Sequence, residues 1–286
     1  MAAAFKVLLD VLVYRLRRRE MANLAGALSL AVVLGLGMSE IARRFAFGLL
    51  LNVLVYLNND CCDLALDSQD PSKDPEKTRY LREHRGAAIA AQLALVAVLV
   101  GLSLLWDPYL LVPFVLGAGV CWAYSARLKR VPGFDVLAMV LWGATMPLVG
   151  TPLDRLLGLV MAVALGLFSG VFESIQVLRD RQEDEALGVR TTAVALGARR
   201  TLLLARALTL AAAGFVVAAL DPFAGLLIAL AALLPCSDGG VPRYWDRVRM
   251  VFGAAWLLTC ARIFLTGGAH GLALELPLRA SVVDLL

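Results

Sequence analysis

Hydrophobic and polar positions alternate in long blocks, rather than residue by residue, along almost the whole chain. A block of about 20 apolar residues is long enough for a helix to cross a bilayer. The pattern therefore predicts an all-α integral membrane protein, multi-pass and folded as a single domain over residues 1–286. Nine transmembrane helices are expected, near residues 21–38, 41–59, 87–106, 109–126, 133–151, 156–179, 200–219, 222–239 and 249–267.

The segment before the first span has a different pattern. Its apolar residues come before the basic cluster "RLRRR", and no small-residue cleavage site follows, so no cleavable signal peptide is expected. The arginines of such a segment favour the level of the lipid headgroups. The pattern predicts an interfacial amphipathic helix over residues 1–20.

Basic residues in the connecting segments indicate how the bundle is oriented. Lys and Arg collect on the cytoplasmic side of a membrane protein. With nine spans and a cytoplasmic N-terminus, every second connection is basic, and the C-terminus is then expected on the opposite side. The basic segments contain Arg15, Arg17, Arg18 and Arg19; Lys73, Lys77, Arg79, Arg82 and Arg85; "ARLKR"; Arg181, Arg190, Arg199 and Arg200; and "RYWDRVR".

The composition supports a membrane protein and excludes several kinds of chemistry. Hydrophobic residues make up 60% of the chain and charged residues 17%, against about 25% charged residues in a typical soluble domain. The net charge of +4 does not suggest a nucleic-acid partner. The 5 cysteines include no CxxC pair and the 2 histidines are far apart, so we expect neither disulfides nor a metal site built on His or Cys.

Two groups of acidic and amide side chains interrupt the apolar pattern. Each group follows helical spacing, because its members fall within an arc of about 100° at 100° per residue. Side chains this costly in lipid should face the interior of the bundle. The groups are about 120 residues apart, both on the expected cytoplasmic side, as if two halves of a bundle faced one site. The first acidic stripe consists of Asn59, Asp60, Asp63 and Asp67, and the second of Glu173, Gln176, Asp180 and Asp184.

Carboxylates that converge from two helices repel one another unless a cation lies between them. Their hard oxygens suit Mg²⁺, which proteins hold with one or two carboxylates together with water and phosphate oxygens. Basic side chains in the same segments would stabilise the phosphate. Solvated helix ends are the alternative, and two stripes on one side, each beside a basic segment, count against it. The basic candidates are Lys73, Lys77, Arg79, Arg127, Lys129, Arg130 and Arg190.

Three segments resemble the motifs of UbiA-type intramembrane prenyltransferases. "NDCCDLALD" (residues 59–67) matches the NDxxDxxxD motif of that family, and "DRQEDEALG" (residues 180–188) matches its second motif, DxxxDxxxG. "YSARLKR" (residues 124–130) is similar to the Tyr-Ser…Lys stretch after the family's fourth span. The chain departs from the family at the first span, where "RRREMANLAG" lacks the common Arg-Pro pair.

The resemblance implies an enzyme whose nine transmembrane helices surround a central cavity that opens at the cytoplasmic side. It would ionise an allylic isoprenoid diphosphate with Mg²⁺, two or more ions being expected, and transfer the prenyl group to an aromatic or quinone-precursor acceptor. Asp60, Asp63 and Asp67 would bind one ion, and Asp180 and Asp184 another. The residues that the resemblance implies in substrate binding are Asn59, Tyr124, Lys129, Arg79 and Arg190, and Gln176 is added as a substrate-binding candidate from its place on the second stripe.

Glu173 stands apart from the other carboxylates because of its depth. It lies seven residues before Asp180, and therefore about 10 Å deeper at 1.5 Å per residue. A carboxylate at that depth marks a functional site by default. We hypothesise that Glu173 is the base at the acceptor site and Gln176 its polar partner, with a structural hydrogen bond as the alternative. The aromatic candidates for stabilising a carbocation, or for ordinary packing, are Tyr56, Trp122, Trp142, Phe168 and Phe172.

The motifs leave more than one function open. An intramembrane terpene cyclase would ionise the same diphosphate with the same aspartates and let the cation react with its own double bonds. Transfer to a lipid-like acceptor is a variant of the first reaction. A transporter or scaffold is disfavoured, because a transporter's polar sites lie near the midplane at broken helices, whereas these stripes lie at the expected cytoplasmic mouth.

Overall fold

The computed structural model describes residues 2–18, 20–68, 74–237 and 239–266, and every regular element in these ranges is a helix. The all-α class is therefore confirmed for this part of the chain. The basic candidates Arg19 and Lys73 lie outside the described residues. The first elements are α1 (Ala2–Arg17), α2 (Ala22–Val33), α3 (Met38–Asp67), α4 (Pro75–Glu83), α5 (Arg85–Trp106), η1 (Pro108–Leu110), α6 (Leu111–Ala126) and η2 (Leu128–Arg130). They are followed by α7 (Phe134–Thr145), η3 (Met146–Gly150), α8 (Leu156–Ala186), α9 (Thr192–Leu196), α10 (Ala198–Ala219), α11 (Pro222–Ala231) and α12 (Val241–Leu265).

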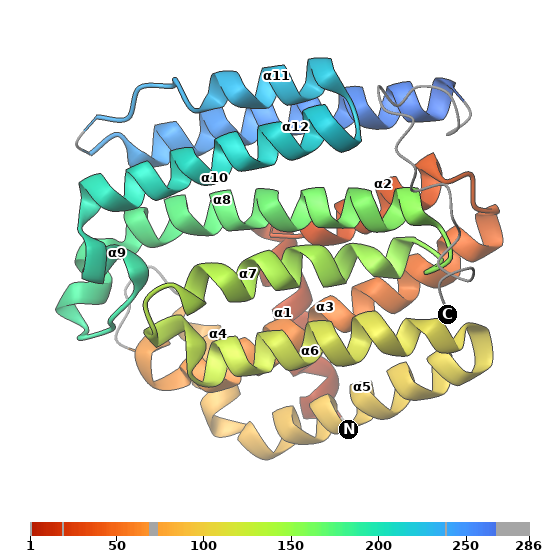
Figure 1. Ribbon diagram of the computed structural model, residues 1–286. Coiled ribbons are helices and arrows are strands. Elements are labelled where there is room, and N and C mark those ends of the chain that lie inside the picture. The colour runs from red at the N-terminus through yellow and green to blue at the C-terminus, as the bar shows by residue number, and fades with distance from the viewer. Residues whose placement is uncertain (1, 19, 69–73, 238, 267–286) are drawn as a thin grey trace.

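The long helices lie side by side in one bundle, and α1 crosses behind it (Figure 1). α8 is central, since it packs against α2, α7, α10 and α12. One hydrophobic core lies between α8 and α10 to α12, and a second lies among α3, α5, α6 and α7. A third, smaller core joins α1 to α3, α4 and α5, with Val7 and Val11 packed near Leu57 and Leu81.

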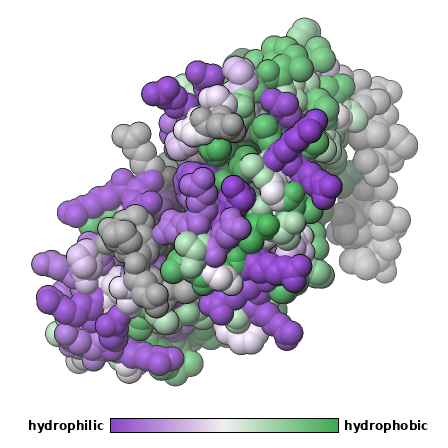
Figure 2. Space-filling view, turned by 90° about the vertical axis from the view of Figure 1, so that its left-hand side faces the viewer, coloured by the Kyte–Doolittle hydropathy of each residue, from purple (hydrophilic) through white to green (hydrophobic). Residues whose placement is uncertain are grey.

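The connections between helices gather at the two ends of the bundle (Figure 1). The end on the left of the figure carries the segments that join α3 to α5, α6 to α7, α8 to α10 and α11 to α12. The other end carries those between α2 and α3, α5 and α6, α7 and α8, and α10 and α11. Figure 2 looks onto the first end, where hydrophilic side chains are concentrated. The basic segments of the sequence thus share one end, as their alternation predicts.

Each of the nine predicted spans overlaps an apolar helix, but the helices are not of equal length. Among the described residues, six are long and apolar enough to cross a membrane: Met38–Ala65, Arg85–Trp106, Pro108–Ala126, Leu156–Ala186, Ala198–Ala219 and Val241–Leu265. The shorter apolar segments are Ala22–Val33, Phe134–Gly150 and Pro222–Ala231. At 1.5 Å per residue, a helix of 12 residues such as α2 covers about 18 Å of a hydrocarbon core about 30 Å thick. Nine complete crossings stay a prediction.

The beginning of α12 corrects the expected boundary of the last span. "RYWDRVR", which the charge pattern assigned to a connection, forms the first turns of this helix. Pro242 stands in the first turn, where its missing N–H costs nothing. Tyr244 and Val248 are buried in the core, while the charged residues between them point outward. An amphipathic turn therefore extends an apolar helix, and a search for uninterrupted apolar runs misses it.

Small residues allow α7 and α8 to approach each other closely. A Cβ atom at Gly143 of α7 would lie 2.3 Å from the Cβ of Ser169. A Cβ at Gly166 of α8 would lie 2.8 Å from the carbonyl oxygen of Val140. Both contacts are shorter than real Cβ atoms make, so glycine is required at both positions. The close packing therefore joins the later part of α7 to the middle of α8, just before the second acidic stripe begins.

Candidate active site

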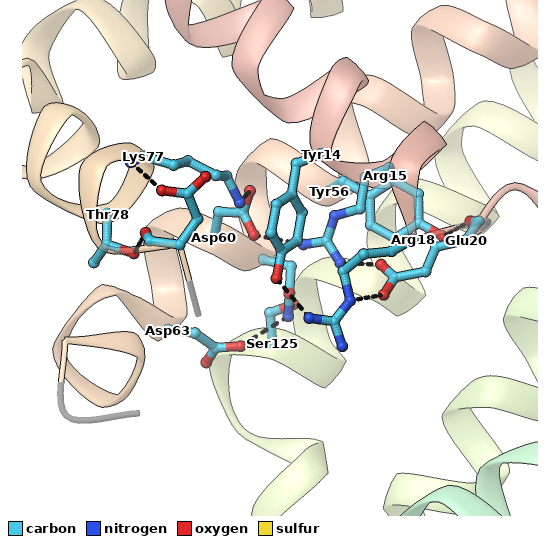
Figure 3. Close-up of polar contacts among 12 residues, drawn as sticks. Tyr14, Arg15, Arg18, Glu20, Tyr56, Asp60, Asp63, Lys77, Thr78 and Ser125 are labelled. Atoms are coloured by element: carbon cyan, nitrogen blue, oxygen red, sulfur yellow. Dashed lines mark hydrogen bonds and ion pairs between the residues drawn. The ribbon is translucent and has the colours of Figure 1, made fainter. Parts of the chain in front are cut away.

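Asp60 is the most enclosed carboxylate of the first acidic stripe. α3 remains helical through Asp67, so the stripe forms one face of its last turns, as predicted. Only 3% of Asp60 is exposed. Its Oδ1 accepts a hydrogen bond of 2.5 Å from Nη2 of Arg15, and its Oδ2 lies 2.7 Å from Nζ of Lys77 (Figure 3). The two oxygens of Asp60 are thus neutralised by cations from α1 and α4.

Arg15 was expected among the lipid headgroups, and that expectation is wrong. The side chain is buried, with 9% exposed, and its guanidinium lies 4.4 Å from the centre of the Tyr56 ring. Nη1 donates a hydrogen bond of 2.5 Å to Glu20. Burial opposes the charge of Arg15, yet the carboxylates of Asp60 and Glu20 raise its pKa above the usual range. Arg15 therefore stays charged at the mouth of the bundle.

The sequence contains a signal that Arg15 is buried. Val7, Val11 and Arg15 are the buried residues of α1, and they follow one another at intervals of four. Residues at this spacing share one helix face. An arginine that continues an apolar face points to a buried anionic partner. The nature of that partner required the fold, because 45 residues separate Arg15 from Asp60.

Asn59 and Asp63 connect the first stripe to α6 and η2. The Asn59 amide donates hydrogen bonds of 2.9 Å to Asp63 and 3.2 Å to the hydroxyl of Ser125, at the end of α6. Nζ of Lys129 in η2 forms an ion pair with Asp63. Burial lowers the pKa of the Lys129 ammonium to about 8, and Arg130 acts in the same direction, while Asp184 of the second stripe opposes the shift. Lys129 is therefore within electrostatic reach of both stripes.

The second stripe runs along the last half of α8. Glu173 is buried, with 6% exposed, and accepts a hydrogen bond of 2.9 Å from the hydroxyl of Tyr124 on α6. Asp180 accepts from Arg179 at 2.7 and 3.0 Å, and Asp184 accepts from the hydroxyl of Thr191 at 3.2 Å. α6 thus contacts both stripes, the second through Tyr124 and the first through Ser125.

The remaining candidates differ in their surroundings. Gln176, Arg79 and Arg190 have exposed side chains, and Asp67 is half-buried at the end of α3. Among the aromatic candidates, Trp122 is exposed on α6, and Trp142 is buried in the packing of α6 and α7. Phe168 and Phe172 both pack edge-on against Phe252 of α12, at ring-centre distances of 4.8 and 5.5 Å. The ring of Tyr56, the fifth aromatic candidate, contacts the guanidinium of Arg15.

Asp135 holds the start of α7 against the segment that follows the second stripe. The carboxylate is completely buried and accepts hydrogen bonds from the backbone N–H of Thr192, at 2.6 Å, and from its hydroxyl. The N–H of Gly133 in turn donates to that hydroxyl at 2.6 Å. The start of α7 and the preceding Gly133 are therefore tied to the first residue of α9, which follows the second stripe in the chain.

The variant Asp135→Asn should destabilise the protein. A neutral amide offers one acceptor in place of a carboxylate, and hydrogen bonds to charged groups contribute about 1.5–3 kcal/mol. We expect the free energy of unfolding in detergent to fall by about 2 kcal/mol. Asp154→Asn, an exposed carboxylate in the connection between α7 and α8, is the control and should change it little. Equal shifts for the two variants would contradict the role of Asp135.

The donor set suits Mg²⁺, although the carboxylates are held apart. Among the described residues, no three His, Cys, Asp or Glu side chains are gathered as a metal-binding group. Mg²⁺ needs only one or two carboxylates when phosphate and water fill its other positions. Asp60 and Asp63 meet this need with hard oxygens, and both are paired with cations of the protein. The site thus attracts positive charge at these two side chains.

A bundle of apolar helices with carboxylates and cations gathered at one end defines an integral membrane protein with a polar site at its mouth. The chain belongs to the UbiA prenyltransferase family, whose model matches residues 21–249. The resemblance of the motifs is thereby confirmed, and so is the membrane location.

Two curated relatives are both named lycopene elongase/hydratase. The chain is 32% identical to the protein of Halobacterium salinarum over 187 residues, which cover 62% of this chain and 65% of the relative. It is 31% identical to the protein of Haloferax volcanii over 214 residues, which cover 72% and 68%. The match thus spans about two thirds of each relative's length.

Solved structures share the fold at low sequence identity. A digeranylgeranylglyceryl phosphate synthase has a TM-score of 0.71 at 14% identity, over 92% of this chain and 99% of that one. A UbiA homologue from Archaeoglobus fulgidus, bound to GPP and Mg²⁺, has a TM-score of 0.59 at 14% identity, over 95% of this chain and 92% of that one. These similarities establish the fold of the bundle.

Proposed function

We propose that this chain is a Mg²⁺-dependent intramembrane prenyltransferase that uses an allylic isoprenoid diphosphate. The observation that carries the proposal is a two-level arrangement on α8. Asp180 and Asp184 lie at the polar end of α8, where Asp184 is within electrostatic reach of Lys129, the partner of Asp63. Glu173 lies about 10 Å deeper than Asp180 and is paired with Tyr124. We call the polar end with Asp180 and Asp184 the upper level, and the depth of Glu173 the lower level. A diphosphate bound at the upper level would point its allylic carbon toward the lower level.

The upper level serves the leaving group. Asp60, Asp63 and Asp67 on α3, together with Asp180 and Asp184 on α8, are the residues that would hold Mg²⁺. When bound, Mg²⁺ supplies Lewis-acid stabilisation of the charge on the departing diphosphate. Lys77 and Lys129, which pair with the first stripe, would turn to the phosphate oxygens. The allylic C–O bond then breaks, and its electron pair leaves with the diphosphate.

The lower level serves the acceptor. A carbon–carbon double bond of the acceptor attacks the allylic cation, and the charge moves onto the acceptor. Loss of a proton from the neighbouring carbon ends the reaction and restores a double bond. Glu173 is the base, because its carboxylate is buried at this depth and is oriented by the Tyr124 hydroxyl. The hydrocarbon walls exclude water and protect the cation.

An acyclic polyene is the acceptor that we favour. The two relatives at 31% and 32% identity are named lycopene elongase/hydratase, and lycopene is such a polyene. An aromatic or quinone-precursor acceptor, expected from the motifs, is the second candidate and would use the same base. A terpene cyclase differs from both because it needs no acceptor.

Product analysis separates these reactions. The purified chain in lipid nanodiscs is incubated with Mg²⁺ and labelled dimethylallyl, geranyl, farnesyl or geranylgeranyl diphosphate. Parallel samples contain lycopene, an aromatic acid such as 4-hydroxybenzoate, or no acceptor. We expect prenylated lycopene, and no product when EDTA is present. A prenylated aromatic acid would assign the second acceptor, and a cyclic terpene formed without acceptor would assign the cyclase. Absence of diphosphate release in every sample would overturn the proposal.

A further inference from the structure

The buried ion pair between α1 and the first acidic stripe has no role in the reaction as derived so far. We infer that Arg15 is an exchangeable cation, which neutralises Asp60 in the absence of ligand and binds the diphosphate when Mg²⁺ takes its place on Asp60. The inference rests on the proposed function, because it takes a diphosphate as the ligand. Its consequence is that Mg²⁺ and the diphosphate bind together, and each alone binds weakly.

Asp60 cannot receive a metal ion without losing a partner. Arg15 occupies Oδ1 at 2.5 Å and Lys77 occupies Oδ2 at 2.7 Å. With 3% of the residue exposed, no oxygen of this carboxylate faces solvent. If Mg²⁺ displaced Arg15 and no other anion took the place of Asp60, a buried charge would be left unpaired, which costs free energy. A ligand that brings negative charge along with the metal ion removes that cost.

The free edge of the Arg15 guanidinium fits a phosphate group. Nη1 is bound to Glu20 and Nη2 to Asp60, while the buried Nε has no hydrogen-bond partner. Nε–H and Nη2–H lie on the same side of the planar guanidinium, and such a pair binds two phosphate oxygens in parallel. When Asp60 is released, Nη2 becomes free beside the unpaired Nε, and the two N–H groups together form a fork that can bind two phosphate oxygens.

The guanidinium is also held in position without Asp60. It stacks on the Tyr56 ring at 4.4 Å, and the Tyr56 hydroxyl donates a hydrogen bond to the backbone carbonyl of Glu20. The Glu20 carboxylate binds both Arg15 and Arg18 (Figure 3). Because Tyr56 and Glu20 keep the plane fixed, Arg15 can change its anionic partner while α1 stays in place.

Binding measurements without turnover test the exchange. The wild-type chain, Arg15→Gln and Arg15→Lys are each placed in nanodiscs. They are titrated calorimetrically with Mg²⁺ alone and with inorganic pyrophosphate at saturating Mg²⁺. Arg15→Gln should bind Mg²⁺ alone several-fold more tightly than wild type, since a competing cation is gone. It should bind pyrophosphate about tenfold more weakly, because the fork is lost. Arg15→Lys should retain the wild-type Mg²⁺ affinity and still lose pyrophosphate affinity.

The control is Arg18→Gln, which removes an exposed cation bound to the same Glu20 and should change both affinities less than about twofold. Opposite shifts for the two ligands in Arg15→Gln support the exchange. Weaker binding of both ligands, or unchanged pyrophosphate affinity in Arg15→Lys, would overturn it. A wild-type chain that binds pyrophosphate with Mg²⁺ but forms no prenylated product would leave the exchange intact and refute the proposed function.

Discussion

Asp60→Ala and Asp180→Ala should each slow the Mg²⁺-dependent release of diphosphate by about 10²- to 10³-fold or more. Each substitution removes one of the carboxylates expected to hold Mg²⁺ against the departing phosphate. The two residues lie on different helices, α3 and α8, so the losses also test whether both stripes serve one reaction. The measurement is release of pyrophosphate from a labelled allylic diphosphate under single-turnover conditions.

Asp60 needs a second variant, because alanine also leaves Arg15 and Lys77 without their common partner. Asp60→Asn keeps the shape of the side chain and should lose activity to a similar extent. Asp246→Ala is the control: this exposed carboxylate near the start of α12 pairs with Arg249 at 3.1 Å and should not affect release. Release that persists in both Asp60→Ala and Asp180→Ala would refute the catalytic role of the stripes.

The helices and the faces of the two stripes could be predicted because both depend on local periodicity. Apolar length predicts a helix wherever the run is uninterrupted, and a repeat of 3.6 residues puts Asp60 and Asp63 on one side of α3. The start of α12 could not be found from apolar length, since Tyr244 and Val248 are separated by charged residues that face outward. Local sequence therefore located the acidic residues and missed an amphipathic helix end.

The partners of those acidic residues could not be predicted, because they come from distant parts of the chain. Arg15 reaches Asp60 across 45 residues, and Asp135 reaches Thr192 across 57. No periodicity links positions so far apart; the packing of α1 on α3 and of α7 on α8 brings them together. Sequence reasoning located the carboxylates and two of the lysines, Lys77 and Lys129, whereas the fold shows which carboxylate each one pairs with and adds Arg15 as a further counter-charge.

These counter-charges change how the site is understood. On the second stripe, Asp180 pairs with its neighbour Arg179. On the first stripe, Arg15, Lys77 and Lys129 neutralise Asp60 and Asp63 with cations of the protein. The same cations are suited to a diphosphate, so neutrality can be preserved before and after the ligand binds.

Glu173→Gln should slow prenyl transfer by about 10²- to 10⁴-fold, which is the usual contribution of a positioned base. Glutamine can still accept the hydrogen bond that Tyr124 donates at 2.9 Å, so the packing between α6 and α8 is kept. Only the capacity to take a proton is lost. Product formation in a single turnover with acceptor measures the loss, and pyrophosphate affinity should stay within about twofold of wild type.

Tyr124→Phe distinguishes a base from a structural hydrogen bond at this position. It leaves the Glu173 carboxylate in place but removes its donor. If the pair were only structural, Tyr124→Phe should be the less stable variant, and Glu173→Gln, which keeps the hydrogen bond, should be about as active as wild type. A base should instead make Glu173→Gln far slower than Tyr124→Phe. Unchanged turnover in Glu173→Gln would remove the base from the mechanism. Because Glu173 lies about 10 Å below Asp180, a loss of transfer with intact pyrophosphate binding would also separate the two levels of α8 experimentally.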